Sequence, residues 1–169
     1  MIDLNLSGKR AVVTGASLGI GAAIVKLLAE QGAQVEFCAR SADAVDALTT
    51  DNNITGHTAD MGNQKSTEDF IQRVLDSGPV DILINNAGIL RDKSFHKSKK
   101  EDWDAVIDVH LHGTANLCRE VWPHMMEAKA GKIVNIGSAA GLYGNFGQSN
   151  YSAAKMGILG LTNTLAEEG

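Results

Sequence analysis

The sequence has few cysteines and no long apolar segment, and each shortage excludes a class of protein. Cys38 and Cys118 are the only cysteines, too few for the disulfide framework of a small secreted domain. Both fall in segments expected to be buried, so we expect two reduced core thiols. No apolar run approaches the roughly 20 residues of a membrane span. The first six residues also lack the basic and apolar regions of a signal peptide, so we expect a cytoplasmic protein without a membrane partner.

An excess of positive charge is also absent. The 169 residues include 15 Lys and Arg against 20 Asp and Glu, which gives a formal net charge of -5. This balance argues against nucleic acid as a partner. The run from Lys97 to Lys100 is followed at once by Glu101 and Asp102, and we interpret it as the solvated start of a helix. The length and the 44% hydrophobic content predict a single globular domain, residues 1–169.

Short apolar runs alternate with amphipathic segments along the whole chain. Strands are expected at residues 10–14, 34–39, 54–59, 80–85 and 132–136, and helices at 20–31, 42–49, 65–75, 102–128 and 151–167. Alternation at this spacing predicts right-handed crossovers and a parallel sheet. The expected fold class is therefore α/β, a doubly wound, Rossmann-like sheet with strand order 3-2-1-4-5.

A glycine-rich turn, residues 14–21, joins the first expected strand to the first helix. Its glycines follow the pattern Gly-x-x-x-Gly-x-Gly. Glycine lets a backbone turn tightly and approach a pyrophosphate, whose charge then faces the N-terminus of the helix. Turn chemistry alone is the alternative, but the strand–turn–helix context favours a dinucleotide site. The residues expected to contribute to it are Gly15, Ser17, Leu18, Gly19, Ile20 and Gly21.

The end of the second strand bears on the choice between the two nicotinamide cofactors. An acidic residue there binds the ribose hydroxyls of NAD, whereas an arginine accommodates the additional phosphate of NADP. Arg40 stands at this position and no acid accompanies it. The guanidinium fork suits a phosphate, so NADP(H) is favoured over NAD(H), although Arg40 could also be an ordinary solvated side chain.

Tyr151 and Lys155 stand four residues apart, which places them on one face of a helix. A lysine ammonium beside a phenol favours the phenolate, and such a phenol can take up or release a proton. Ser138 stands thirteen positions before the tyrosine and could hold a substrate oxygen. This set suits alcohol–carbonyl redox chemistry, and we find no pattern of metal ligands. Tyr-x-x-x-Lys alone also occurs by chance in many helices.

Four segments together resemble the short-chain dehydrogenases/reductases: residues 14–21, residues 85–88 (Asn-Asn-Ala-Gly), Ser138, and residues 151–155 (Tyr-Ser-Ala-Ala-Lys). They occur in the family's order over nearly the whole chain. The resemblance implies that Asp60 and Met61 lie near the adenine. It also implies that Asn86, Ala87 and Gly88 lie beside the adenosine ribose, and that Lys155 also holds the nicotinamide ribose. A homo-oligomer, dimer or tetramer, is the family expectation.

Two longer stretches, residues 85–95 and 141–151, are most similar to the (3R)-hydroxyacyl-CoA dehydrogenase domains of D-bifunctional enzymes. The resemblance implies an oxidoreductase of lipid metabolism acting on 3-hydroxyacyl or 3-oxoacyl thioesters. Most of the family has asparagine where this chain has His110, and the resemblance gives that position a proton-relay role. A helix residue hydrogen-bonded inside the fold is the equal alternative for His110. Bacterial 3-oxoacyl-thioester reductases and general carbonyl or steroid reductases remain alternatives for the whole chain.

The sequence stops soon after the expected helix that carries Tyr151 and Lys155, where family members normally continue. We therefore expect a chain that is incomplete at its C-terminus, with the fifth strand at a sheet edge. A non-catalytic nucleotide-binding module is a further alternative. Tyr143 and Phe146 could line a substrate pocket or serve as packing within their loop.

Overall fold

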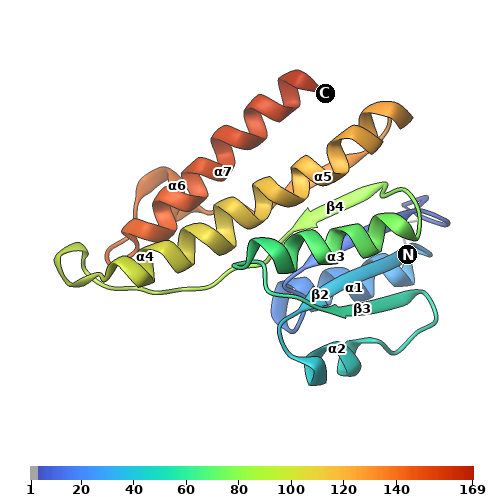
Figure 1. The fold of residues 1–169 in the computed structure, drawn as a ribbon, viewed down its shortest axis with the longest axis horizontal. Coiled ribbons are helices and arrows are strands. Elements are labelled where there is room, and N and C mark those ends of the chain that lie inside the picture. Colours follow the sequence, from blue (N-terminus) through green and yellow to red (C-terminus); the bar gives the residue numbers. More distant parts are fainter. Residues whose placement is uncertain (1–3) are drawn as a thin grey trace.

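Five parallel strands form one sheet at the centre of the molecule (Figure 1). The computed structural model describes residues 4–169. The strands are β1 (Arg10–Thr14), β2 (Gln34–Ala39), β3 (Ile54–Thr58), β4 (Ile82–Asn85) and β5 (Lys132–Asn135). Their order is β3-β2-β1-β4-β5, and every neighbouring pair is parallel. The expected fold class and strand order are confirmed.

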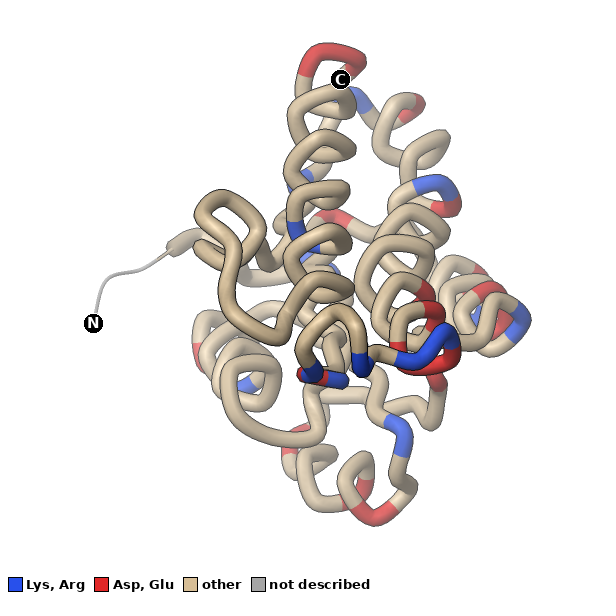
Figure 2. The backbone as a smooth tube through the Cα atoms, turned by 90° about the vertical axis from the view of Figure 1, so that its left-hand side faces the viewer, with Lys and Arg blue, Asp and Glu red and all other residues tan. Residues whose placement is uncertain are grey.

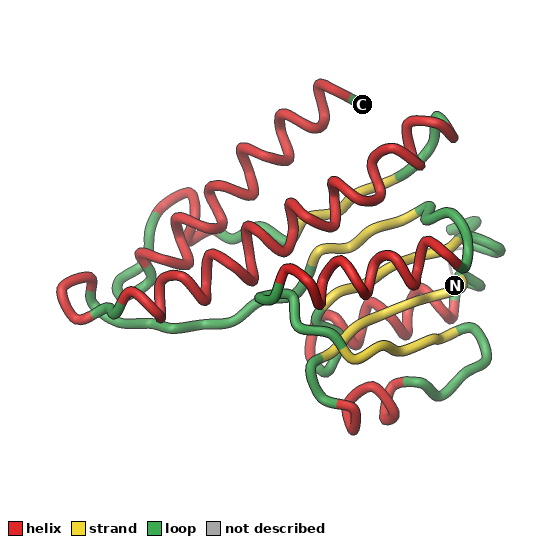
Figure 3. Tube along the Cα trace, viewed as in Figure 1, coloured by secondary structure: helices red, strands yellow, loops and turns green. Residues whose placement is uncertain are grey.

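Seven α-helices connect or follow these strands in the described part of the chain. They are α1 (Gly19–Glu30), α2 (Ala42–Leu48), α3 (Gln64–Asp76), α4 (Lys100–Ile107), α5 (Gly113–Ala128), α6 (Ala139–Tyr143) and α7 (Ser149–Glu168). Most bounds differ by one or two residues from those expected. The short α6 was not expected, because its five residues carry no periodic apolar pattern. A long loop runs from β4 to α4 and contains one 3-10 turn, Phe95–Lys97 (Figure 3).

The two faces of the sheet bury separate hydrophobic cores. Val12 of β1 packs with Phe70 of α3 and Leu117 of α5 on one face. The next residue, Val13, packs with Val25 of α1 and Phe37 of β2 on the other. This alternation follows from the pleat, which turns successive side chains to opposite faces. Helices therefore cover both faces, as the apolar strands predicted.

The two cysteines are free thiols, and both are buried, as expected. Cys38 and Cys118 both belong to the core that contains Val12, Phe70 and Leu117. Burial raises the pKa of Cys38 to about 12 and that of Cys118 to about 11, so both stay protonated. Within residues 4–169 no helix is long and apolar enough to cross a bilayer.

A π-helical turn, Asp108–His112, lies between α4 and α5. The long helix expected over residues 102–128 is therefore divided into α4, the π turn and α5, and Pro123 lies inside α5. A π turn holds one extra residue in the helical path, and such turns are common at functional sites. Val109 and His110 of this turn are buried, so the extra residue brings two side chains inward. Apolar periodicity does not reveal a change of one residue, so the π turn could not be predicted from the apolar pattern.

A ladder of polar side chains fastens α7 to the sheet. Asn85 of β4 donates to the Asn135 side-chain oxygen at 2.8 Å, and Asn135 donates to the Thr162 hydroxyl of α7 at 2.9 Å. Buried amides are stabilising only where their hydrogen bonds are made, so this ladder fixes the position of α7. Helices α3 and α5 cover one face of the sheet, and α4 lies beyond the ends of the strands (Figure 1).

Candidate functional site

A pocket of about 560 Å³ opens at the carboxyl ends of the strands. Its walls come from the β1–α1 turn, the ends of β2, β3 and β4, the π turn and α7. Doubly wound sheets bind their ligands at this edge, where the strand order reverses. Of the residues expected to take part in catalysis or cofactor binding, all except Ser138 line the pocket. They are Gly15, Ser17, Leu18, Gly19, Ile20, Gly21, Arg40, Asp60, Met61, Asn86, Ala87, Gly88, His110, Tyr151 and Lys155.

The glycine turn has no room for side chains at two positions. A Cβ on Gly15 would lie 2.6 Å from the Ala87 Cα, and Gly15 has a φ of +66°. A Cβ on Gly21 would lie 2.5 Å from the Asn86 side-chain nitrogen. Only glycine meets both demands without strain. The turn consequently packs directly against the segment that follows β4.

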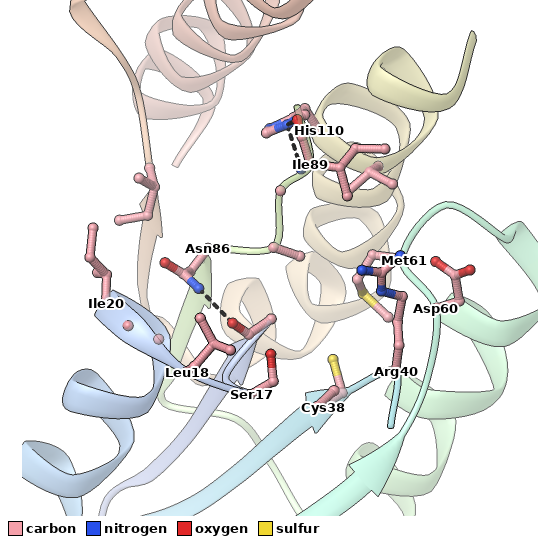
Figure 4. A pocket seen from close by; sticks show the side chains of 18 of the residues that line it. Ser17, Leu18, Ile20, Cys38, Arg40, Asp60, Met61, Asn86, Ile89 and His110 are labelled. Carbon is pink, nitrogen blue, oxygen red and sulfur yellow. Dashed lines mark hydrogen bonds between the residues drawn. The ribbon is translucent and has the colours of Figure 1, made fainter. Parts of the chain in front are cut away.

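Thr14 and Asn86 hold these two segments together. The Thr14 hydroxyl accepts hydrogen bonds from the amides of Asn86 and Ala87 at 3.1 and 3.0 Å. The Asn86 side chain donates to the carbonyls of Thr14 and Gly15 at 2.9 and 3.1 Å (Figure 4). Because these bonds link the ends of β1 and β4, the floor of the pocket is preorganised. Thr14 was not singled out from the sequence, although it opens the glycine turn.

Helix α1 directs its N-terminus at the pocket, and no side chain caps it. Leu18 occupies the N-cap position without a side-chain hydrogen bond. The first amides of a helix have no partners within the helix, and they suit an anion. A dinucleotide pyrophosphate therefore fits the turn: the backbone is close, the amides are available and the dipole is favourable.

Arg40 and Asp60 extend from neighbouring strand ends at one side of the pocket (Figure 4). The Arg40 side chain is exposed and follows β2 directly. Asp60 accepts a hydrogen bond from the Gly62 amide at 2.9 Å, which fixes its carboxylate. The one acid within β2, Glu36, is held away from the pocket by ion pairs with Arg10 and His57. Arg40 is thus the charged residue that the tip of β2 offers to a ligand.

Tyr151 and Lys155 meet His110 at the inner end of the pocket. The Lys155 ammonium lies 5.7 Å from the centre of the Tyr151 ring, and the His110 ring meets the Tyr151 ring edge-on at 5.1 Å. Lys155 donates a hydrogen bond to the Ile136 carbonyl. Burial lowers the pKa of Lys155 to about 8, so this amine can change its protonation state near neutral pH.

His110 combines one anchored nitrogen with one that has no partner. Its Nε2 lies 2.9 Å from the Ile89 carbonyl oxygen and 3.0 Å from the Ile89 amide nitrogen. Its Nδ1 is buried and makes no hydrogen bond in the structure. Burial lowers the pKa of His110 to about 4, which keeps the ring neutral at pH 7. A neutral ring with an unpaired nitrogen can bind a polar ligand atom or a water molecule.

Ser138 is the proposed site residue that does not line the pocket. It is the N-cap of α6, and its hydroxyl oxygen accepts a hydrogen bond from the Ala140 amide at 3.2 Å. The hydroxyl hydrogen is not used by this contact. Ser138 is half-buried and follows β5 by three residues, so it stands at the same edge of the sheet as the pocket.

The sequence reasoning missed several residues that line the pocket, and most are apolar. They are Cys38, Ala39, Ala59, Ile89, Leu90, Val109 and Ile136. Four of them lie at or next to the ends of strands, which the strand assignments could have indicated. Tyr143 and Phe146 are 86% and 91% exposed, so they are not packed within their loop, and neither of them lines this pocket.

The fold and this pocket together define a nucleotide-binding enzyme of the doubly wound α/β class. The family model described as short chain dehydrogenase matches residues 9–169. The chain belongs to the short-chain dehydrogenase/reductase family, as the resemblance implied, and that family binds NAD or NADP.

Relatives from both of the expected branches match almost the whole chain. It is 46% identical to the peroxisomal multifunctional enzyme A of Dictyostelium discoideum, over 98% of this chain and 40% of that one. It is 38% identical to the 3-oxoacyl-[acyl-carrier-protein] reductase FabG of Thermotoga maritima, over 98% of this chain and 70% of the other. The chain thus spans well under half of the multifunctional relative.

A solved structure supports the assignment of the fold. A metagenomic short-chain oxidoreductase in complex with NADP has a TM-score of 0.91 and 38% sequence identity. The match covers 96% of this chain and 77% of that one.

Proposed function

We propose that this chain catalyses reversible hydride transfer between a nicotinamide and a secondary alcohol or ketone, with a 3-hydroxyacyl or 3-oxoacyl thioester as substrate. The observation that carries the proposal is the meeting of Tyr151, Lys155 and His110 at one end of a pocket whose other end is the glycine turn. The names of the bacterial relatives support the thioester, since these proteins are reductases of 3-oxoacyl groups carried on a protein.

In the proposed reduction, Tyr151 gives its phenolic proton to the substrate oxygen, and in the oxidation it takes that proton back. The bound nicotinamide supplies or accepts the hydride. Lys155 stabilises the phenolate by its positive charge and holds the nicotinamide ribose. Ser138 donates its free hydroxyl hydrogen to the substrate oxygen and offsets the charge that develops there. For this role its side chain must reach the substrate from the N-cap of α6.

His110 is proposed to pass protons between Tyr151, Lys155 and solvent. Its unpaired, buried Nδ1 supports this role because a water molecule bound there would lie among the groups that exchange protons. The anchored Nε2 fixes the ring, so that the position of Nδ1 does not depend on the ligand.

Arg40 supports NADP(H) as the preferred cofactor, with NAD(H) the second candidate. Its guanidinium stands at the tip of β2 with no acid available to bind ribose hydroxyls. The relative solved with NADP is consistent with this preference. Asp60 and Met61 would face the adenine, and residues 86–88 its ribose.

The alternatives are a non-catalytic nucleotide-binding module and a carbonyl or steroid reductase of broad specificity. A steady-state assay with NADPH and acetoacetyl-coenzyme A, beside a titration of NADPH fluorescence, distinguishes them. Turnover that Tyr151→Phe abolishes, with nucleotide affinity retained, supports the proposal. Binding without turnover of any carbonyl substrate favours the module, and turnover of simple ketones but not thioesters favours the carbonyl reductase.

Members of the family typically form oligomers, and we propose a homodimer or homotetramer for this chain. Light scattering coupled to size exclusion measures the mass of the assembly directly. A monomer at micromolar concentration contradicts the proposal.

A further inference from the structure

The loop between β4 and α4 lines the pocket at Ile89 and Leu90 and then carries a concentration of basic side chains. Residues 91–100 follow Leu90 directly. These ten residues, here called the basic segment, contain five Lys and Arg side chains and one acid, in a chain whose net charge is -5. Figure 2 looks onto this end of the molecule and shows blue segments there with red ones beside them.

Hydrogen bonds tie the basic segment to the loop before α7. The Lys93 amide donates to the Gly147 carbonyl at 2.8 Å, and the Gln148 side chain donates to Asp92 at 2.8 Å. The Asn150 side chain donates to the Arg91 carbonyl at 3.3 Å, one residue before Tyr151. The start of the basic segment is therefore fixed close to the proposed proton donor. Seven extended residues span at most about 25 Å, which bounds the distance from Leu90 to Lys97.

Only part of this positive charge is neutralised within the chain. Asp102 serves two cations, Lys93 at 3.2 Å and Arg91 at 4.0 Å. Lys97 and Lys99 are exposed, and neither forms an ion pair among the residues that the structure describes. Lys97 and Lys99 precede α4, which begins at Lys100, so they are not part of the solvated helix start expected from the sequence. Exposed lysines without acidic partners attract phosphates as mobile point charges.

An aromatic ring stands among these lysines. Phe95 begins the 3-10 turn that ends at Lys97, and it is 73% exposed. Contact with a flat ligand removes the apolar surface of an exposed ring from water, which favours binding. Nucleobases stack on such rings. Lysines beside an exposed ring match the phosphates and base of a nucleotide. A ligand that carries only negative charge would bind the lysines but would make no use of the ring.

We propose that the basic segment binds the phosphorylated adenosine end of a coenzyme A thioester, with Lys97 and Lys99 at the phosphates and Phe95 at the adenine. The inference rests on the proposed function, because the thioester carbonyl must lie at Tyr151. In such a substrate the acyl group and the nucleotide lie at opposite ends of the pantetheine arm. The chain has a corresponding order: Ile89 and Leu90 line the pocket, and the basic segment continues outward from them while its first residues are hydrogen-bonded to the start of α7.

The test compares two thioesters of the same acyl group, acetoacetyl-coenzyme A and the acetoacetyl thioester of N-acetylcysteamine, which lacks the nucleotide. The double variant Lys97→Gln/Lys99→Gln is expected to raise KM for the coenzyme A ester about tenfold, since each exposed charge pair contributes a factor of about three. Its kcat, and its KM for the short thioester, stay unchanged. The double variant Lys26→Gln/Lys65→Gln, which removes the same charge from α1 and α3, is the control and leaves both KM values unaltered.

Salt and ring variants sharpen the test. Raising ionic strength should increase KM for the coenzyme A ester in the original protein and much less in the Lys97/Lys99 variant. Phe95→Ser should raise KM for the coenzyme A ester alone. An equal effect of these variants on both thioesters, or none on either, overturns the proposal. An effect confined to a carrier-protein thioester also overturns it.

Failure of the proposed function is distinguishable from failure of this inference. If no thioester is turned over, the proposed function fails. Binding of desulfo-coenzyme A to the NADP-saturated protein, measured by calorimetry, then decides the inference separately. A Kd that weakens in the Lys97/Lys99 variant but not in the control supports it, and equal Kd values overturn it.

Discussion

Gly88 and His110 lie so close that any side chain at position 88 would meet the imidazole. A Cβ on Gly88 would stand 2.5 Å from the His110 Cε1 and 3.3 Å from Nδ1. The glycine after β4 therefore serves the placement of a histidine 22 positions later. The imidazole of His110 occupies the space that a side chain at position 88 would need.

Gly88→Ala should displace the His110 ring and lower kcat by about tenfold or more, while the affinity for NADPH changes less. The added methyl group has no space, so the free energy of unfolding should also fall by about 1–3 kcal/mol. Steady-state kinetics and urea denaturation measure the two effects. Gly160→Ala in α7 is the control, because a Cβ there meets no atom within 4 Å. Unchanged kcat in Gly88→Ala would contradict the role given to His110.

The buried amine of Lys155 predicts a pH dependence of stability. Its folded-state pKa is about 8 against 10.5 for an exposed lysine, so the unfolded chain binds the additional proton between these values. Stability contributed by this group therefore rises as pH increases from about 8 to about 10.5. The gain is of order 2–3 kcal/mol. The comparison is between the original protein and Lys155→Met, by urea denaturation at several pH values. If the free energy of unfolding changed with pH in the same way in both proteins, the pKa of Lys155 would not be lowered in the folded state.

Arg40→Ala should raise KM for NADPH by about tenfold or more and leave KM for NADH almost unaltered, because in the proposed binding mode the guanidinium meets only the additional phosphate. Steady-state kinetics with both cofactors measure the change. Arg73→Ala on α3 is a control for the loss of one positive charge. A similar loss with NADH and NADPH would mean that Arg40 does not select between them.

Thr162→Val should lower the free energy of unfolding by about 1–2 kcal/mol, because it leaves the Asn135 amide without its partner. It should also reduce kcat, since α7 carries Tyr151 and Lys155. Thr164→Val, on an exposed position of the same helix, is the control and should change neither quantity by a comparable amount. Loss of stability without loss of activity would show that these hydrogen bonds do not contribute to the placement of Tyr151 and Lys155.

The strand order and the residues of the glycine turn followed from the sequence because both depend on local pattern. Apolar runs alternate with helical periodicity, and glycines at a strand–helix junction have few other uses. Tyr151 and Lys155 were found for the same reason, since helical spacing brings them together. Their placement beside the glycine turn depends only on the order of parallel strands.

Contacts between distant segments were not predictable in the same way. The hydroxyl of Thr14 bonds to residues 72 and 73 positions later, and no local pattern marks it. The cap role of Ser138 depends on the short α6, which has too few residues for a periodic signal. The partnerless Nδ1 of His110 depends on the π turn, whose extra residue leaves the apolar pattern nearly intact.

The number of residues in the π turn determines which side chain faces Tyr151. Each residue of a helix is rotated by roughly 100° from the one before it. Deleting one residue from Asp108–His112 would restore regular winding and turn a different side chain toward Tyr151. A lineage could in this way exchange the imidazole for another group in a single genetic event, while Tyr151 and Lys155 stayed as they are.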